Sequence, residues 1–261
     1  MTMRPVLLEY DLGDGVRAFS TTRSGGCGKG AYGEFNANMF CGDDKKNVEA
    51  NREYLCAELG IGTESLIIPH QVHGTVCADI DDGFMRLGDD ERAERLEGVD
   101  AMLTCEKGVC IGVSTADCIP ILLYDRKKGV AGAVHAGWRG TARRIAEKAV
   151  GRMKDEFGSR AEDIRAVVGP GISLESFEVG DEVYEEFGHE GFPMEEIARR
   201  YGEKWHIDLW KANTLQLEGE GVRSENIEVA GICTYKNYDR FFSARRLSIN
   251  SGRILTGIMM N

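Results

Sequence analysis

The sequence lacks any apolar run long enough to cross a membrane. Its start, Met1–Tyr10, has too short an apolar stretch for a secretory signal peptide, so we expect a cytoplasmic protein. The chain also lacks an excess of basic residues, because 32 Lys and Arg stand against 43 Asp and Glu, for a net charge of −11. Such a surface offers little attraction to nucleic acids or anionic membranes, and we expect neither as a partner.

No Cys-x-x-Cys pair occurs among the eight cysteines, which argues against a thioredoxin-like or zinc-ribbon site. In a reducing compartment we expect these cysteines to be free thiols or metal ligands. No repeat, linker or low-complexity segment divides the 261 residues. With 42% hydrophobic and 29% charged residues, the composition predicts one globular domain over residues 1–261.

What the chain does contain is a cysteine and a histidine at one end of a predicted hairpin. The apolar runs Ile119–Tyr124 and Val130–Val134 flank a charged loop that ends at Gly129. A four-residue loop, 125–128, places Cys118 opposite His135, and opposed residues in a hairpin have Cβ atoms about 4.5–5.5 Å apart. Pro120 cannot donate to a strand ladder, which places it at a strand start or a sheet edge.

A thiol beside an imidazole is compatible with three interpretations. The pair can be a nucleophilic thiolate with its base, two ligands of a metal, or a buried structural pair. The choice between the first two depends on whether a third ligand exists. One stretch offers candidates, because a short strand beginning at Ser65 delivers His70, Gln71 and His73 into a turn.

Three further segments carry cations that could hold an anion. The glycine-rich loop Arg23–Gly30 lacks the Walker spacing and is also compatible with a plain surface loop. A helix predicted over Thr141–Phe157 begins just after Arg139, and a helix N-terminus attracts anions. The segment Tyr238–Arg246 combines aromatic and basic residues, which suit either a flat base with a phosphate or a packed aromatic edge.

Periodicity predicts the remaining helices and strands. The charge-dense segment Asp79–Glu97 is expected to be a solvent-exposed excursion from the core. His189 and His206 are expected to be surface residues. The expected helices cover residues 45–60, 181–187, 195–201 and 208–217, and the expected strands cover residues 16–22, 99–104, 109–114, 164–168, 227–233 and 253–259.

Six segments together resemble the YfiH-type laccase-domain family, in its order and over nearly the whole chain. They are Phe19–Gly26, His70–Gly74, Thr115–Cys118, His135–Gly140, Val168–Ile172 and Arg240–Arg246. Thr-Ala-Asp-Cys followed by His-Ala-Gly-Trp-Arg-Gly is the most specific part of the match. The chain departs from the family at Phe35–Phe40, where Phe-Asn-Ala-Asn-Met-Phe stands in place of a Leu-Asn-Leu-Gly pattern.

The resemblance implies an α+β fold, with mixed β-sheets packed between layers of helices in a single domain. It also implies a zinc site whose ligands are His73, Cys118 and His135. The third ligand, His73, then comes from the turn that carries His70, Gln71 and His73, called the histidine turn below. Two imidazoles and a thiolate suit Zn²⁺, with Cu²⁺ as a second candidate, and three protein ligands leave a fourth position open.

The activity implied by the resemblance is phosphorolysis of adenosine, inosine, guanosine and methylthioadenosine, together with deamination of adenosine. Purine nucleosides and phosphate are then the partners, and Asp117 is the candidate proton carrier for deamination. The candidate substrate contacts are Arg23, Gln71, Arg139, Arg245 and Arg246. The alternatives are a cysteine hydrolase that uses Cys118 and His135, and a copper polyphenol oxidase, which five histidines are too few to support as a multicopper site.

Overall fold

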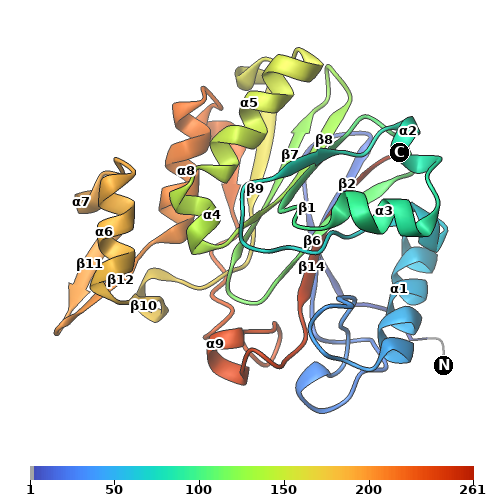
Figure 1. The fold of residues 1–261 in the computed structure, drawn as a ribbon, viewed down its shortest axis with the longest axis horizontal. Coiled ribbons are helices and arrows are strands. Elements are labelled where there is room, and N and C mark those ends of the chain that lie inside the picture. Colours follow the sequence, from blue (N-terminus) through green and yellow to red (C-terminus); the bar gives the residue numbers. More distant parts are fainter. Residues whose placement is uncertain (1–2) are drawn as a thin grey trace.

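Two mixed β-sheets stacked face to face form the centre of the molecule (Figure 1). The computed structural model describes residues 3–261. The first sheet has the order β1 (Leu7–Tyr10), β2 (Val16–Thr21), β14 (Ile254–Met260), β6 (Cys110–Thr115) and β3 (Leu66–Ile67). The second has the order β13 (Ile227–Val229), β9 (Ile164–Val168), β7 (Ile119–Asp125), β8 (Val130–Ala136), β5 (Ala101–Thr104) and β4 (Cys77–Asp79).

Strand β7 shows why its sequence is continuously apolar. Ile119, Ile121 and Leu123 pack in the core on the helix side of the sheet, whereas Leu122 and Tyr124 pack in the core between the two sheets. Successive side chains of a strand point to opposite faces, so a strand buried on both faces needs apolar residues at every position. The central hairpin therefore has little freedom to move relative to the core.

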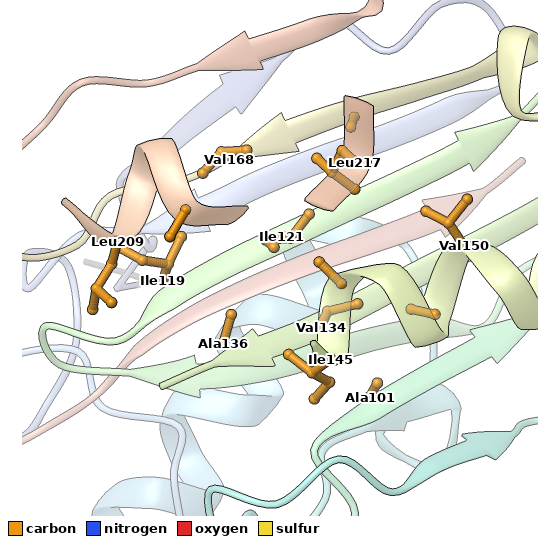
Figure 2. Packing of buried hydrophobic residues seen from close by; sticks show 14 of the residues in the cluster. Ala101, Ile119, Ile121, Val134, Ala136, Ile145, Val150, Val168, Leu209 and Leu217 are labelled. Atoms are coloured by element: carbon orange, nitrogen blue, oxygen red, sulfur yellow. The ribbon is translucent and has the colours of Figure 1, made fainter. Parts of the chain in front are cut away.

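Helices cover the outer face of each sheet. The face of the second sheet is covered by α4 (Trp138–Ala142), α5 (Ile145–Phe157) and α8 (Leu209–Gly219). Figure 2 shows this layer, with Ile145 and Val150 of α5 and Leu209 and Leu217 of α8 around Ile121 of β7. Helix α1 (Lys45–Leu59), capped by Asp44 and ended by Gly60, packs through Leu55 and Leu59 on the first sheet. The fold is therefore α+β with mixed sheets between helical layers in a single domain, as expected.

A smaller sheet projects from this centre (Figure 1). It has the order β10 (Glu178–Val179), β12 (Lys204–Ile207) and β11 (Ala198–Tyr201), with α6 (Asp181–His189) and α7 (Met194–Ile197) beside it. Tyr184 of α6 stacks on Trp205 of β12, with ring centroids 3.9 Å apart. The remaining short helices are α2 (Asp82–Met85), α3 (Asp89–Leu96) and α9 (Ala244–Leu247).

The structure corrects several local predictions. The helix expected from Thr141 to Phe157 is broken at Arg144, which has a left-handed backbone with φ of 63°. The region 195–201 ends as strand β11, and the excursion from Asp79 to Glu97 contains α2 and α3. His206 is buried, with Nδ1 2.9 Å from the Leu174 carbonyl oxygen, whereas His189 is exposed as expected.

The β7–β8 register also differs, by two residues. Asp125 pairs with Val130, so the loop is 126–129, and Pro120 rather than Cys118 lies opposite His135. Pro120 is the second residue of an interior strand, which makes it a strand start and not an edge. Within residues 3–261, no helix combines the length and the apolar character needed to span a bilayer.

Candidate active site

Three side chains from separate turns and strands meet at one end of the central hairpin. His135 lies near the end of β8, Cys118 immediately precedes β7, and His73 lies in the turn that follows β3. Their ligand atoms all lie within 4.8 Å of one another. The two-residue register shift still leaves Cys118 diagonal to His135, so the sequence placed the thiol and the imidazole correctly in one location.

Asp100, just before β5, connects two of these residues. Its Oδ1 lies 2.7 Å from Nδ1 of His135, and its Oδ1 and Oδ2 accept the backbone N–H groups of His73 (3.0 Å) and Gly74 (2.6 Å). Those contacts hold His73 in its left-handed conformation, with φ of 63°. With Nδ1 of His135 bonded to the carboxylate, Nε2 is the nitrogen left for a metal, which is the usual arrangement of a histidine ligand.

The charges of the cluster reinforce each other. Burial alone would raise the pKa of the Cys118 thiol, but the neighbouring His135 and His73 lower it to about 6. Burial would lower the pKa of His135, but Cys118 and Asp100 raise it to about 9. For Asp100, burial is likewise outweighed by His135 and by backbone N–H groups, so its pKa lies below its usual value. The cluster therefore favours a thiolate, which is the form of cysteine that binds metals.

Gly137 leaves the space that such a ligand set needs. A Cβ atom at this position would lie 2.8 Å from Cδ2 of His73 and 3.1 Å from Sγ of Cys118. Two imidazoles and one thiolate that converge beside a residue without a side chain, with one imidazole oriented by a carboxylate, fit a zinc ion. The residues present are thus suited to the expected metal.

The cluster lines a cavity of about 610 Å³. Among the other residues in its wall are Phe40, His70, Asp117 and Arg245. Ser114 and Thr115, at the end of β6, also belong to this wall. The cavity thus combines the candidate metal ligands with two arginines, Arg245 and Arg253.

Comparison with known proteins gives the family of the chain and its named relatives. The chain matches the family described as multi-copper polyphenol oxidoreductase laccase over residues 17–261. The chain belongs to this family. A Bacteroides thetaiotaomicron protein named purine nucleoside phosphorylase is 49% identical over 248 residues, which cover 94% of this chain and 92% of that protein. A protein from an unknown prokaryotic organism, named adenosine deaminase RL5, is 44% identical over 247 residues, or 94% of each chain.

A solved structure shares the fold over nearly its full length. The crystal structure of the Bacillus licheniformis hypothetical protein YfiH superimposes with a TM-score of 0.93 and 28% identity, covering 98% of this chain and 97% of that one. The laccase-family resemblance and the α+β fold expected from the sequence are both confirmed.

Of the four arginines expected at the site of this laccase-family chain, the structure places one in the cavity wall. Arg245 lines the cavity and donates from Nη1 to the Glu178 carbonyl oxygen, 3.1 Å away. The other three are not among the lining residues. Arg23 donates to the carbonyl oxygens of Gly33 and Tyr238, Arg139 lies over the Trp138 ring, and Arg246 lies over the rings of Tyr235 and Tyr238.

Gln71 and Asp117 line the cavity, but their polar atoms are already engaged. The Gln71 amide exchanges two hydrogen bonds with the backbone of Ser114, at 2.7 and 2.9 Å. The Asp117 carboxylate accepts from the Thr234 hydroxyl and from the Arg245 backbone N–H, both at 2.7 Å. Gln71 therefore fixes the histidine turn against β6, and Asp117 fixes the start of α9 and with it Arg245.

Sequence reasoning missed Asp100, Phe40 and Arg253 at this laccase-family site. Asp100 is a lone acid beside an apolar strand, and its partners lie 26–35 positions away along the chain. Phe40 lies in the segment that departs from the family pattern, and that departure was the available signal. Asn36, in the same segment, is fully buried and bonds to Asp43 and to the backbone of Arg253, so its role is structural.

Proposed function

We propose that this chain is a zinc-dependent purine nucleoside phosphorylase that also deaminates adenosine. The observation that carries the proposal is the 49% identity, over 94% of the chain, to a protein named purine nucleoside phosphorylase. The 44% identity to a protein named adenosine deaminase RL5 supports the second activity. We expect adenosine, inosine, guanosine and methylthioadenosine as substrates, with phosphate as the second reactant, in a cytoplasmic enzyme.

The geometry supports the metal part of the proposal. His73, Cys118 and His135 would hold zinc, with a fourth position left for water or substrate, as in catalytic zinc sites. When bound, the ion would supply Lewis acidity toward water or substrate atoms. Asp100 would keep His135 in the tautomer that leaves Nε2 available. Copper is a second candidate, since the same ligands bind it, but a multicopper site needs more histidines than the five in the chain.

The cavity supports the nucleoside part. Its volume of about 610 Å³ lies within the roughly 300–1,000 Å³ typical of small-molecule sites. Arg245 supplies a cation for phosphate, and the Asp117 carboxylate positions this residue by accepting the Arg245 backbone N–H. A guanidinium orients an anionic nucleophile and offsets charge repulsion as the phosphate approaches the ribose. Asp117 lines the same cavity and is the candidate proton carrier for deamination, a role in which its carboxylate would give up the hydrogen bond from Thr234 or from the Arg245 backbone.

A phosphorolysis assay with inosine tests the proposal. We expect phosphate-dependent release of hypoxanthine by the wild-type protein, one zinc ion per chain, and loss of both zinc and activity in His73→Ala and Cys118→Ala. The matched control is Cys105→Ala, because Cys105 is exposed and lies outside the cluster. Full hypoxanthine release by both cluster variants would show that the zinc mechanism is wrong.

A second candidate, a cysteine hydrolase, is favoured by one observation. Cys118, His135 and Asp100 form a chain of nucleophile, base and orienting acid, and the lowered pKa of Cys118 suits a nucleophile. Metal analysis separates the two functions. A purified protein that holds neither zinc nor copper, and whose activity is abolished by alkylation of Cys118, would support the hydrolase instead.

A further inference from the structure

His70 lies in the wall of the same cavity as the candidate metal ligands, but it is not part of their cluster. Its Nδ1 lies 2.8 Å from each carboxylate oxygen of Glu97, just after α3. Its backbone N–H donates to Leu96, and its carbonyl oxygen accepts from Gly98. Main chain and side chain thus hold one imidazole against the end of α3.

Phe40 fixes the plane of this imidazole from the other side. The two rings stack with centroids 4.3 Å apart and planes at 27°. The Phe40 backbone N–H donates to Oδ1 of Asn38 at 2.6 Å, which holds the loop that carries the ring. One face of the His70 ring stacks on Phe40, and its Nδ1 is bonded to Glu97. Nε2 is therefore the ring nitrogen available to a substrate, and it has no hydrogen-bond partner within residues 3–261.

The other ionisable groups of the wall, outside the candidate ligands, are less suited than His70 to protonate a departing purine. Asp117 uses one carboxylate oxygen for Thr234 and the other for the Arg245 backbone. Burial raises the pKa of the Cys41 thiol. Arg245 and Arg253 carry guanidinium groups, which do not deprotonate in proteins. Imidazole, in contrast, exchanges protons readily near neutral pH.

From this arrangement we infer that His70 is a catalytic residue, which donates the proton that the departing purine needs. The inference rests on the proposed phosphorylase activity. As the bond between ribose C1′ and the purine breaks, its electron pair moves onto the base, and the proton on Nε2 of His70 passes to a purine ring nitrogen. The phosphate oxygen bonds to C1′, and the proton of hydrogen phosphate returns to His70. Between these steps His70 is a neutral imidazole whose Nδ1–H lies on the Glu97 carboxylate, and the returned proton restores the imidazolium form on Nε2.

The substrate pair inosine and 7-methylinosine tests this role. The methylated purine already carries the positive charge that protonation provides, so it leaves without a general acid. We expect His70→Asn to lower kcat for inosine by about 100-fold or more, the usual contribution of a general acid, and to leave kcat for 7-methylinosine within a few-fold of wild type. Zinc content should not change, and His189→Asn, at an exposed histidine, should behave as wild type.

The failures of the inference and of the proposed function give different results. If wild type cleaves inosine and His70→Asn keeps its kcat, or loses activity equally on both substrates, His70 is not the proton donor. Equal loss would place it in binding, as a stacking surface with Phe40. If wild type leaves both nucleosides intact in the presence of phosphate, the proposed function itself is wrong, and the role of His70 falls with it.

Discussion

The buried carboxylate of Asp100 lies 2.7 Å from Nδ1 of His135 and also accepts the backbone N–H groups of the turn that carries His73. One side chain therefore sets the orientation of one imidazole and the backbone conformation that presents another. The two candidate ligands come from a strand and from a turn that are distant in sequence, and Asp100 makes them a single rigid unit.

Replacing this carboxylate should weaken metal binding without removing a ligand. In Asp100→Asn the amide nitrogen cannot accept hydrogen bonds at the position of one carboxylate oxygen. Either His135 and the His73 N–H lose the acceptor Oδ1, or the N–H groups of Val72 and Gly74, beside His73, lose Oδ2. We expect a loss in zinc affinity of roughly 10- to 100-fold, the usual effect of changing a group that orients a metal ligand. Competition with a chromogenic chelator measures it. Asp90→Asn, at an exposed acid of α3, is the control, and equal zinc affinities in all three proteins would contradict the role of Asp100.

Gly137 offers a steric test of the same centre. In Gly137→Ala the new Cβ would lie 2.8 Å from the His73 ring and 3.1 Å from the Cys118 sulfur, so one of the ligands must move. A displacement of this size takes the ligands out of bonding range, because zinc–ligand distances are fixed to within about 0.2 Å. We expect zinc to be lost on dialysis while the thermal unfolding of the metal-free protein is little changed.

The control for that substitution is Gly151→Ala. Gly151 lies in α5, and a Cβ there meets no atom within 4 Å. Alanine at an unhindered helical position should stabilise the protein by about 0.5–1 kcal/mol and leave zinc binding intact. Unaltered zinc retention in Gly137→Ala would show that the ligands can adjust, and that the glycine is not required.

Much of the fold could be predicted because the apolar pattern determines it locally. The β7–β8 hairpin is two apolar runs around a charged loop, but its register depends on a detail the pattern does not contain. Asp125 stays in the strand, paired with Val130, while its carboxylate accepts the N–H groups of Lys127 and Lys128 and forms the turn. The break at Arg144 is similar. The helical periodicity continues through it, but its guanidinium bonds to the Glu190 carbonyl oxygen and lies over Phe192, contacts that the sequence does not reveal.

For the site too, the sequence indicated some residues, whereas long-range contacts decided the others. The sequence predicted His73, Cys118 and His135 through the family resemblance, and local pattern alone indicated that two of them would meet. Which of the two α9 arginines reaches the cavity could not be predicted, since Arg245 and Arg246 are adjacent and differ only in the direction that α9 gives them. That direction depends on the long-range bond between Asp117 and the Arg245 backbone.

This adjacent pair of arginines makes a matched test of phosphate binding. Arg245→Ala removes one of the two guanidinium groups of the cavity wall, the other being that of Arg253, which donates to backbone carbonyl oxygens. It should raise the KM for phosphate by roughly tenfold or more, since a hydrogen bond to a charged group contributes about 1.5–3 kcal/mol. Arg246→Ala changes the neighbouring residue, whose guanidinium stacks on Tyr235 and Tyr238, and should leave KM near the wild-type value. Initial rates over a range of phosphate concentrations measure both. The reverse order of effects would place the phosphate on the other side of α9.

Removing the metal should expose a reactive thiol. In the metal-free protein the pKa of Cys118 is lowered to about 6, so the thiolate predominates at neutral pH and its alkylation rate should rise as the pH passes through about 6 and then level off. Cys77, whose pKa burial raises to about 11, should remain mostly a thiol over that range. Iodoacetamide labelling, followed by mass spectrometry of peptides, resolves the two sites.

Adding zinc should suppress labelling of Cys118 and leave that of exposed Cys105 unchanged, whereas equal labelling of Cys118 with and without zinc would show that this sulfur is not a ligand.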